Sequence, residues 1–396
     1  MGVSSEMRAL QPARSLMLLG TALAAAACGV QASPMASELP AEPAGWSALP
    51  AAPLPARHSA HAFWSGNEVL LLGGSDARPC PPDADCPPPE EPPLRDGAIF
   101  NRAAGTWRHM TVAPVPLGQA SGALLDGVLY LWVPGIEHAD AVRAAFLGFA
   151  IAENRWVELE PPPGPADQLR LVAAGSRLVA YHGSHEANVR PDLAYDPQTG
   201  GWSELPVDAF APAYDRTAVW TGRELVVLGV RIDPGRAPNA PPVYSAAALD
   251  AALVTWRRLP DSEVAGNSPG WYWAGGSIVN ASIGSADGGQ VNNWGRRYPF
   301  GGMLTHPAGQ WMALPDPPAR LGGYPDVSVG GSEHVVADGW VLEVATDRWT
   351  ELTRPPGGSE QGEAVVWAGD RLVVWGGVRW TAGDPTLLNE GWAWVP

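Results

Sequence analysis

The chain has 396 residues, among them 46 glycines, 42 prolines and 19 tryptophans, and it lacks extended amphipathic helical patterns, so an all-β protein is expected. Its formal net charge is -16, which disfavours nucleic acid as a partner because an acidic surface repels phosphate backbones. All 25 basic residues are arginine, so chemistry that needs a lysine, such as a Schiff base or a P-loop, is excluded.

Residues 1–32 have the features of an export signal. Arg8 and Arg14 supply a positive n-region, and Leu16 to Ala27 form an apolar stretch of 12 residues. A helix that spans a membrane needs about 20 apolar residues, so this stretch predicts a signal peptide and not a membrane-spanning helix.

Two cleavage patterns overlap at the end of this signal. The run from Leu23 to Gly29 resembles a bacterial lipobox, in which Cys28 would be lipidated and become the new N-terminus, although alanine stands where leucine is usual. Val30-Gln31-Ala32 would instead suit an ordinary signal peptidase, which requires small residues. We favour the lipobox, and in either case residues 33–44, rich in Ala, Pro, Ser and Glu, are predicted to be a flexible tether.

Cys80 and Cys86 are an even pair once Cys28 is assigned to the signal. They close a short proline-rich loop, and an oxidising compartment makes a disulfide the expected outcome. A metal site is the alternative, but two thiols without nearby histidines would give incomplete ligation.

A tryptophan motif repeats along residues 45–396. Its members share a tryptophan followed three residues later by leucine or methionine, with a proline usually close behind, and begin at Trp46, Trp107, Trp156, Trp202, Trp256, Trp311 and Trp349. Neighbouring tryptophans are 38 to 61 residues apart, and a period near 50 indicates a repeat fold. We therefore expect one domain over residues 45–396, although the length alone would suggest two or three.

Each repeat contains the pattern of four strands. Two apolar runs flank a glycine turn, most clearly in residues 63–74, 219–229 and 366–377, and this pattern predicts a hairpin. A third run leads into a turn with Asp or Asn, as at Asn101 and Asp196, and the fourth strand begins at the tryptophan. Four strands in each repeat of about 50 residues predict the blades of a β-propeller.

The two ends of the domain are predicted to share a blade. The segment from Asp370 to Pro396 supplies a second and a third strand but no fourth, whereas Trp46 begins a fourth strand with nothing before it. The sequence therefore predicts a seven-bladed propeller that is closed by pairing of its N-terminal strand with the C-terminal blade.

The repeated residues resemble the kelch family of β-propellers, which includes the central domain of galactose oxidase and many exported bacterial proteins. The resemblance covers Trp46 to Pro396 and rests on the glycine that ends each second strand, the Asp turn and the blade tryptophan; the family's double glycine occurs at 73–74 and 376–377. It implies a propeller fold. The copper chemistry of galactose oxidase is disfavoured, because it needs a cysteine crosslinked to a tyrosine and no cysteine follows Cys86.

All long insertions are predicted to lie on one face of the ring. They follow the second strands, at residues 75–96, 136–143, 231–242, 285–299 and 379–389. Variable loops on a rigid scaffold are where binding sites are normally built, so we expect this face to bind a ligand around the mouth of the central channel.

Several polar and aromatic residues are predicted at this mouth. They are Arg57, His58, His61, His182, His185, Glu186, Tyr214, Asp215, Arg216, Trp271, Tyr272 and Glu363. One interpretation is a pocket suited to a sugar or peptide, oriented by arginines and carboxylates; the other is that these are ordinary solvated loop residues. The histidine pairs 58/61 and 182/185 lack the helical context of a metal motif, so no metal or cofactor is expected.

Two functional hypotheses follow. The first is an exported binding module for a protein or glycan at the bacterial envelope, periplasmic or secreted, monomeric, and attached to a membrane only through a lipid on Cys28. The alternative is a sugar epimerase or lyase with His61 or His182 as acid or base and Arg216 on a substrate carboxylate. No catalytic signature was found, so we favour the first.

Overall fold

The computed structural model describes residues 44–81, 84–87, 89, 91–135, 143–164, 168–235, 243–262, 264, 270–281, 298, 300–317, 328–337 and 339–396. The predicted signal at residues 1–32, the lipidation site Cys28 and the predicted tether up to residue 43 lie outside the described residues. The described part of the chain folds into strands, and it contains no helix that could cross a membrane.

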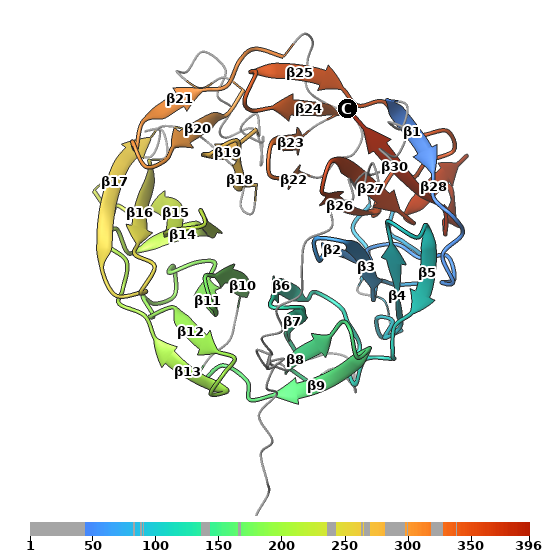
Figure 1. The fold of residues 1–396 in the computed structure, drawn as a ribbon, viewed down its shortest axis with the longest axis horizontal. Helices are drawn as coiled ribbons and strands as arrows, with labels where there is room; N and C mark the ends of the chain where they lie inside the picture. Colours follow the sequence, from blue (N-terminus) through green and yellow to red (C-terminus); the bar gives the residue numbers. More distant parts are fainter. Residues whose placement is uncertain are drawn as a thin grey trace, which may run out of the picture.

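Seven antiparallel sheets of four strands each surround a central axis as the blades of a propeller (Figure 1). The strands of each blade are given from the innermost outwards. The first blade consists of β2 (His61–Trp64), β3 (Glu68–Leu72), β4 (Gly97–Asn101) and β5 (Thr106–His109), and the second of β6 (Ser121–Leu125), β7 (Val128–Val133), β8 (Ala145–Ala150) and β9 (Arg155–Leu159). The third consists of β10 (Leu169–Ala174), β11 (Arg177–His182), β12 (Leu193–Asp196) and β13 (Gly201–Glu204). The fourth blade consists of β14 (Ala213–Trp220), β15 (Leu225–Arg231), β16 (Tyr244–Leu249) and β17 (Trp256–Ser262), and the fifth of β18 (Tyr272–Ala274), β19 (Ser277–Asn280), β20 (Gly302–Thr305) and β21 (Trp311–Ala313). The sixth consists of β22 (Val329–Gly330), β23 (His334–Ala337), β24 (Trp340–Glu343) and β25 (Arg348–Glu351).

The seventh blade joins the two ends of the domain, as the sequence predicted. It consists of β26 (Ala364–Ala368), β27 (Arg371–Trp375), β30 (Gly391–Val395) and β1 (Gly45–Ala48). Strand β1 is the outermost strand, and its Trp46 pairs with Trp394 of β30. The predicted seven-bladed all-β propeller and its closure are therefore confirmed.

Two blades differ from the regular pattern. The insertion after β27 forms an additional hairpin, β28 (Val378–Thr381) and β29 (Asp384–Leu387), which the sequence marked only as a loop. The sixth blade has a first strand of only two residues, β22.

The middle strands of each blade are continuous apolar runs because both of their faces are covered by neighbouring blades. Leu70 and Leu72 of β3, for example, pack in one cluster with Leu129 and Leu131 of β7.

The turn from β6 to β7 shows why the sequence predicts a hairpin there. Asp126 and Gly127 both have positive φ, 49° and 76°, which is the backbone that a two-residue hairpin of this type requires.

The repeated tryptophans tie each blade to the one before it. Every one of the seven donates a hydrogen bond from its indole N–H to a carbonyl oxygen of the preceding blade, and each acceptor is the fourth residue after that blade's own tryptophan. The pairs are Trp46 to Thr353, Trp107 to Pro50, Trp156 to Thr111, Trp202 to Glu160, Trp256 to Pro206, Trp311 to Pro260 and Trp349 to Pro315, at 2.6 to 2.9 Å. Proline suits this acceptor position because it keeps its carbonyl although it lacks an N–H.

Candidate functional site

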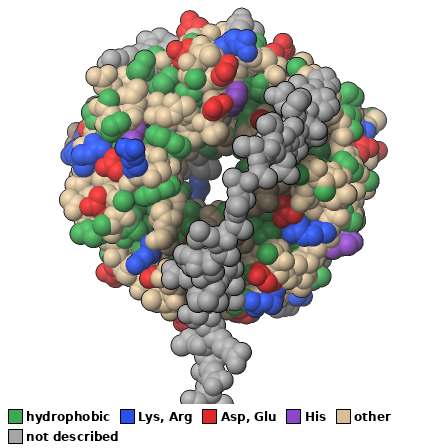
Figure 2. Space-filling model, viewed as in Figure 1, with side chains coloured by type: hydrophobic (Ala, Val, Ile, Leu, Met, Phe, Trp, Pro, Cys, Tyr) green, Lys and Arg blue, Asp and Glu red, His purple; other side chains and the backbone are tan. Residues whose placement is uncertain are grey.

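The second strands that the five predicted insertions follow all end on one face of the ring, which we call the ligand face. These strands are β3, β7, β15, β19 and β27, and the chain also passes from blade to blade on this face. Residues 136–142, 236–242, 282–297 and 299 of these insertions lie outside the described residues. Seen down its axis, the ring is open at the centre, and acidic and basic side chains are scattered over the visible face (Figure 2).

A cavity of 720 Å³ lies where the innermost strands of the first three blades begin. We call it the channel-mouth cavity. It is lined by His61, Ala62, Phe63, Gln119, Ala120, Ser121, Gly122, Trp132, Pro134, Gln168, Leu169, Arg170, Leu171 and Tyr181. Because innermost strands begin on the ligand face, this cavity opens on the face that the sequence predicted to bind a ligand.

The ring of His61, the first residue of β2, is fixed in one tautomer. Its Nε2 is hydrogen-bonded to the carbonyl oxygen of Gly118, and since a carbonyl can only accept, Nε2 carries the hydrogen and Nδ1 is an acceptor. Burial lowers the pKa of His61, although the Gly118 carbonyl acts in the opposite direction. The ring is therefore neutral at pH 7 and presents a bare nitrogen.

Ser121 and Gln168 are also held in defined positions. The Ser121 hydroxyl oxygen accepts the backbone N–H of Leu171 in the next blade at 2.9 Å, which leaves the hydroxyl hydrogen able to be donated elsewhere. Gln168 precedes β10 directly and has φ of 56°, a left-handed backbone that is costly for a residue with a side chain. The carbonyl of Gln168 accepts the N–H of Gly183, which helps to maintain this conformation.

Charged side chains lie beside this cavity. Asp215 also has a left-handed backbone, with φ of 49°, at a β-bulge between Tyr214 and Thr217. The pKa of Asp215 is raised by partial burial among neighbouring atoms and by the charge of Glu186, while Arg170 acts to lower it. Asp215 and Glu186 are exposed. Because both Glu186 and Arg170 affect the pKa of Asp215, the two carboxylates and the Arg170 guanidinium lie near one another at the edge of the mouth.

Arg216 is not available to a ligand, contrary to its predicted orientation of a substrate. Its side chain is 1% exposed, and its guanidinium donates to the carboxylates of Asp192 at 2.7 Å and Asp208 at 2.8 Å. Although burial acts to lower the pKa of Arg216, the charges of both carboxylates raise it overall. The three side chains form an internal ion-pair cluster between the third and fourth blades.

Arg57 has a comparable internal role. It is fully buried and donates to both carboxylate oxygens of Asp96, at 2.6 and 2.9 Å, and to the carbonyl of Gly73 at 3.1 Å. These hydrogen bonds lower the pKa of Asp96 despite the opposing effect of burial. The two predicted arginines therefore hold loops of the ligand face in place and do not line the channel-mouth cavity.

The predicted histidines are distributed among different environments. His182 and His185 are 6% and 3% exposed, and both lie beside the Arg216 cluster. Burial, and then the charge of Arg216, lower the pKa of His185, so its ring is neutral. Within the described residues, no group of three or more His, Cys, Asp or Glu side chains is placed to hold a metal ion.

The remaining predicted residues are mostly packing residues. Trp271 is 3% exposed and packs against Tyr244, and the Tyr272 hydroxyl donates to the carbonyl of Ser328 at 2.6 Å. Burial raises the pKa of Tyr272. Glu363 is also buried and accepts a hydrogen bond from Ser359, whereas Tyr214 is half-buried at the bulge of β14.

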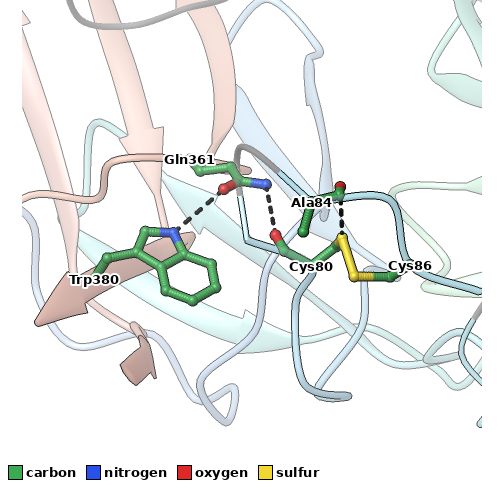
Figure 3. The surroundings of a disulfide bond; sticks show 5 residues. All are labelled: Cys80, Ala84, Cys86, Gln361 and Trp380. Carbon is green, nitrogen blue, oxygen red and sulfur yellow. Dashed lines mark hydrogen bonds between the residues drawn. A yellow bond between two sulfur atoms is a disulfide. The ribbon is translucent and has the colours of Figure 1, made fainter. Parts of the chain in front are cut away.

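The predicted disulfide is present, and it shapes a second cavity on the ligand face. Cys80 and Cys86 are bonded, and Gln361 links their loop to the seventh blade by donating to the Cys80 carbonyl at 3.4 Å and accepting from the Trp380 indole at 3.3 Å (Figure 3). The cavity has a volume of 510 Å³ and is lined by the cysteine loop together with His58, Gln361 and Val378. Burial lowers the pKa of His58.

Of the residues predicted for the channel mouth, only His61 lines the channel-mouth cavity. Gln119, Gln168 and Arg170 were missed, as were the aspartates that pair with the arginines. The sequence does contain a pattern that could have identified the two glutamines. Gln119 and Gln168 lie just before innermost strands, near the position that His61 occupies in the first repeat.

Comparison with known proteins adds no functional assignment to this geometry. No family model matches the chain, and no curated protein matches its sequence.

Proposed function

We propose that this chain is an exported, kelch-type ligand-binding propeller of the bacterial cell envelope, which takes its ligand at the channel-mouth cavity. The observation that carries the proposal is that cavity, whose 720 Å³ falls within the roughly 300 to 1,000 Å³ of ligand pockets. It combines apolar side chains with a few polar groups of fixed orientation, which is how small-molecule sites are usually composed.

Binding without catalysis fits the chemistry of the described residues better than the enzyme alternative. His61 has one ring nitrogen committed to the Gly118 carbonyl, His182 is buried, and Arg216 is neutralised by its own aspartates. An acid–base mechanism needs a titratable group within reach of the substrate together with a group that orients it. His182 and Arg216 are adjacent, but both are buried and neither lines the channel-mouth cavity with His61.

An array experiment tests the proposal. We expect the purified protein to bind members of a glycan or peptide array, and Arg170→Gln to reduce the signal by roughly fivefold or more because it removes a charged donor from the cavity. The matched control is Arg177→Gln in the same blade, since Arg177 lies at the turn on the opposite face and pairs with Asp196.

Each outcome of the array bears on a different statement. Equal signals for both variants and the wild type would place the ligand elsewhere and overturn the channel-mouth site. Turnover of a bound sugar would overturn the non-catalytic function and favour the epimerase or lyase alternative.

The export part of the proposal is supported by the sequence of residues 1–32 alone. We expect cells given a labelled fatty acid to incorporate it into the wild type and not into a Cys28→Ala variant. Incorporation that survives in the variant would exclude lipidation of Cys28, and export of an unlabelled protein would favour cleavage after Ala32.

A further inference from the structure

We propose that the channel-mouth cavity binds an uncharged carbohydrate of one or two hexose units. This inference rests on the proposed function and adds the chemical class of the ligand to it. Four features of the cavity carry it: its hydrogen-bonding groups, its charge, its apolar wall and its strained backbone.

The hydrogen-bonding groups of the cavity match hydroxyl groups better than any other ligand group. Nδ1 of His61 can only accept, Arg170 can only donate, and the Ser121 hydroxyl has its hydrogen left to donate. The amides of Gln119 and Gln168 can do both. A sugar hydroxyl also donates and accepts, so a ring that carries several hydroxyls can form hydrogen bonds with both the donors and the acceptors of the cavity. An apolar ligand would remove water from these polar groups without replacing their hydrogen bonds.

The charge at the mouth favours a neutral ligand. His61 is uncharged at pH 7 because burial lowers its pKa, so Arg170 is the only formally charged side chain among the described residues that line the cavity. The carboxylates of Glu186 and Asp215 lie close enough to Arg170 and to each other for the pKa of Asp215 to respond to both neighbours. An acidic sugar would meet these carboxylates, and a cationic ligand would meet Arg170.

One wall of the cavity is apolar. Phe63, Pro134 and Leu171 line it, and the ring of Phe63 lies so close to Gly122 that a Cβ there would be 2.5 Å from a ring carbon. A pyranose ring has C–H groups on its faces in addition to its hydroxyls, so it can pack such a face against this wall while its edge forms hydrogen bonds.

A lining residue of the cavity, Gln168, and a residue beside the cavity, Asp215, have positive φ. Gln168 and Asp215 both have left-handed backbones that glycine would adopt more readily. Asp tolerates this backbone, but a glutamine at position 168 lowers stability, and a side chain that contacts a ligand accounts for its presence there. The strain also provides a test in which stability and binding change in opposite directions.

The experiment is calorimetric titration of the purified protein with glucose, galactose and mannose, their 6-carboxylates, their 2-amino derivatives, and the neutral disaccharides maltose, cellobiose and lactose. We expect at least one neutral sugar to bind roughly tenfold more tightly than its acidic counterpart. Gln168→Gly should weaken this binding by roughly fivefold to tenfold, the value of one or two hydrogen bonds, without lowering the melting temperature, because it relieves backbone strain.

Two further variants complete the test. Gln198→Gly is the matched control, because Gln198 is an exposed glutamine at a turn on the opposite face, and its binding should equal that of the wild type. Asp215→Asn keeps a residue that tolerates the left-handed backbone but removes one negative charge, so it should improve binding of the acidic sugars severalfold.

The possible failures are distinguishable. Preferred binding of an acidic or amino sugar would overturn the uncharged class, and sugar binding that Gln168→Gly leaves intact would overturn the site. If no sugar binds but a peptide from the array does, and Arg170→Gln abolishes that binding, the carbohydrate inference fails while the proposed function stands. If no ligand depends on Arg170, both fail.

Discussion

Arg216 shows how strongly the internal charges of this propeller depend on one another. Its guanidinium is shared by Asp192 and Asp208, and all three side chains are almost completely buried. Removing one partner from a buried ion-pair cluster leaves uncompensated charge in the interior, which costs far more than breaking an exposed pair.

We therefore predict that Arg216→Met lowers the free energy of unfolding by about 3 to 5 kcal/mol, because two buried carboxylates lose their cation. Arg177→Met, which removes an exposed pair with Asp196, should cost about 1 kcal/mol or less. Urea denaturation of both variants measures the difference. Similar small losses would mean that the cluster is hydrated and not internal.

The Arg57–Asp96 pair predicts a pH dependence. The pKa of Asp96 is lower in the folded protein than in the unfolded chain, so the pair stabilises the fold above about pH 4, where the unfolded carboxyl is also ionised. This stabilisation is lost as the pH falls through the lower, folded pKa.

Asp96→Asn should accordingly be less stable than the wild type at pH 7, by about 1 kcal/mol given that Asp96 is partly exposed. The difference should shrink as the pH is lowered below about 4. Chemical denaturation of both proteins between pH 7 and pH 2 measures it. A difference that is constant with pH would show that the charge of Asp96 is not responsible.

At the scale of residues, the sequence predicted that Arg57 and Arg216 lie at the channel mouth, whereas both side chains are buried. The reason is that their partners lie 8 to 39 residues away along the chain, and only folding brings the carboxylates to the guanidinium groups. Burial of a charged side chain is decided by such pairing and has no local pattern.

Among the elements, the cysteine loop is an addition to the regular blade. It is attached to the seventh blade through Gln361, and the Arg78–Asp384 pair at 3.8 Å reaches the additional hairpin, but both of those side chains are largely exposed. Such a pair contributes little, so the disulfide is the main constraint on the loop.

We predict that reduction of the Cys80–Cys86 bond acts locally. The bond closes a loop of only a few residues outside the strands, so the Cys80→Ser/Cys86→Ser variant should melt within about 3 °C of the wild type, while cleavage between residues 75 and 96 becomes faster. Limited proteolysis and thermal melting together distinguish the two effects. A large loss of melting temperature with no new cleavage site would show that the bond stabilises the whole ring.

The blade tryptophans were predicted as strand markers, but their role is specific to the tertiary structure. Each indole N–H bonds to the preceding blade, and no periodicity within one repeat indicates which carbonyl it reaches. The additional hairpin β28–β29 was likewise not predicted, because its short strands lie inside an insertion whose pattern resembles a loop.

For the molecule as a whole, closure of the ring depends on strand β1. Besides its backbone pairing with β30, Trp46 of this strand bonds to Thr353 of the sixth blade. Two backbone hydrogen bonds also join the segment between β1 and β2 to the seventh blade: the Arg57 carbonyl accepts from Gly377, and the Arg57 N–H donates to Leu388.

Deleting residues 45–50 should therefore lower the melting temperature of the entire domain, by roughly 10 °C or more, while the transition remains cooperative. Deleting residues 33–43 of the predicted tether, which spans residues 33–44, is the control and should have no effect. Differential scanning calorimetry measures both, and an unchanged transition after loss of β1 would contradict closure by this strand.

The sequence by itself determined the fold of this protein, its seven blades, the joining of its ends and the face that carries the insertions. These follow from local patterns that repeat, namely hairpin turns, apolar runs and the spacing of tryptophans. Because each pattern recurs in several blades, the prediction rests on several independent occurrences of the same pattern. Only the tertiary structure decided which side chains meet: that Arg57 and Arg216 are held inside by aspartates, and that His61, Ser121, Gln168 and Arg170 line one cavity. Such convergence joins different blades, and contacts between distant segments are set by packing and by pairing of buried charge, which no local pattern contains.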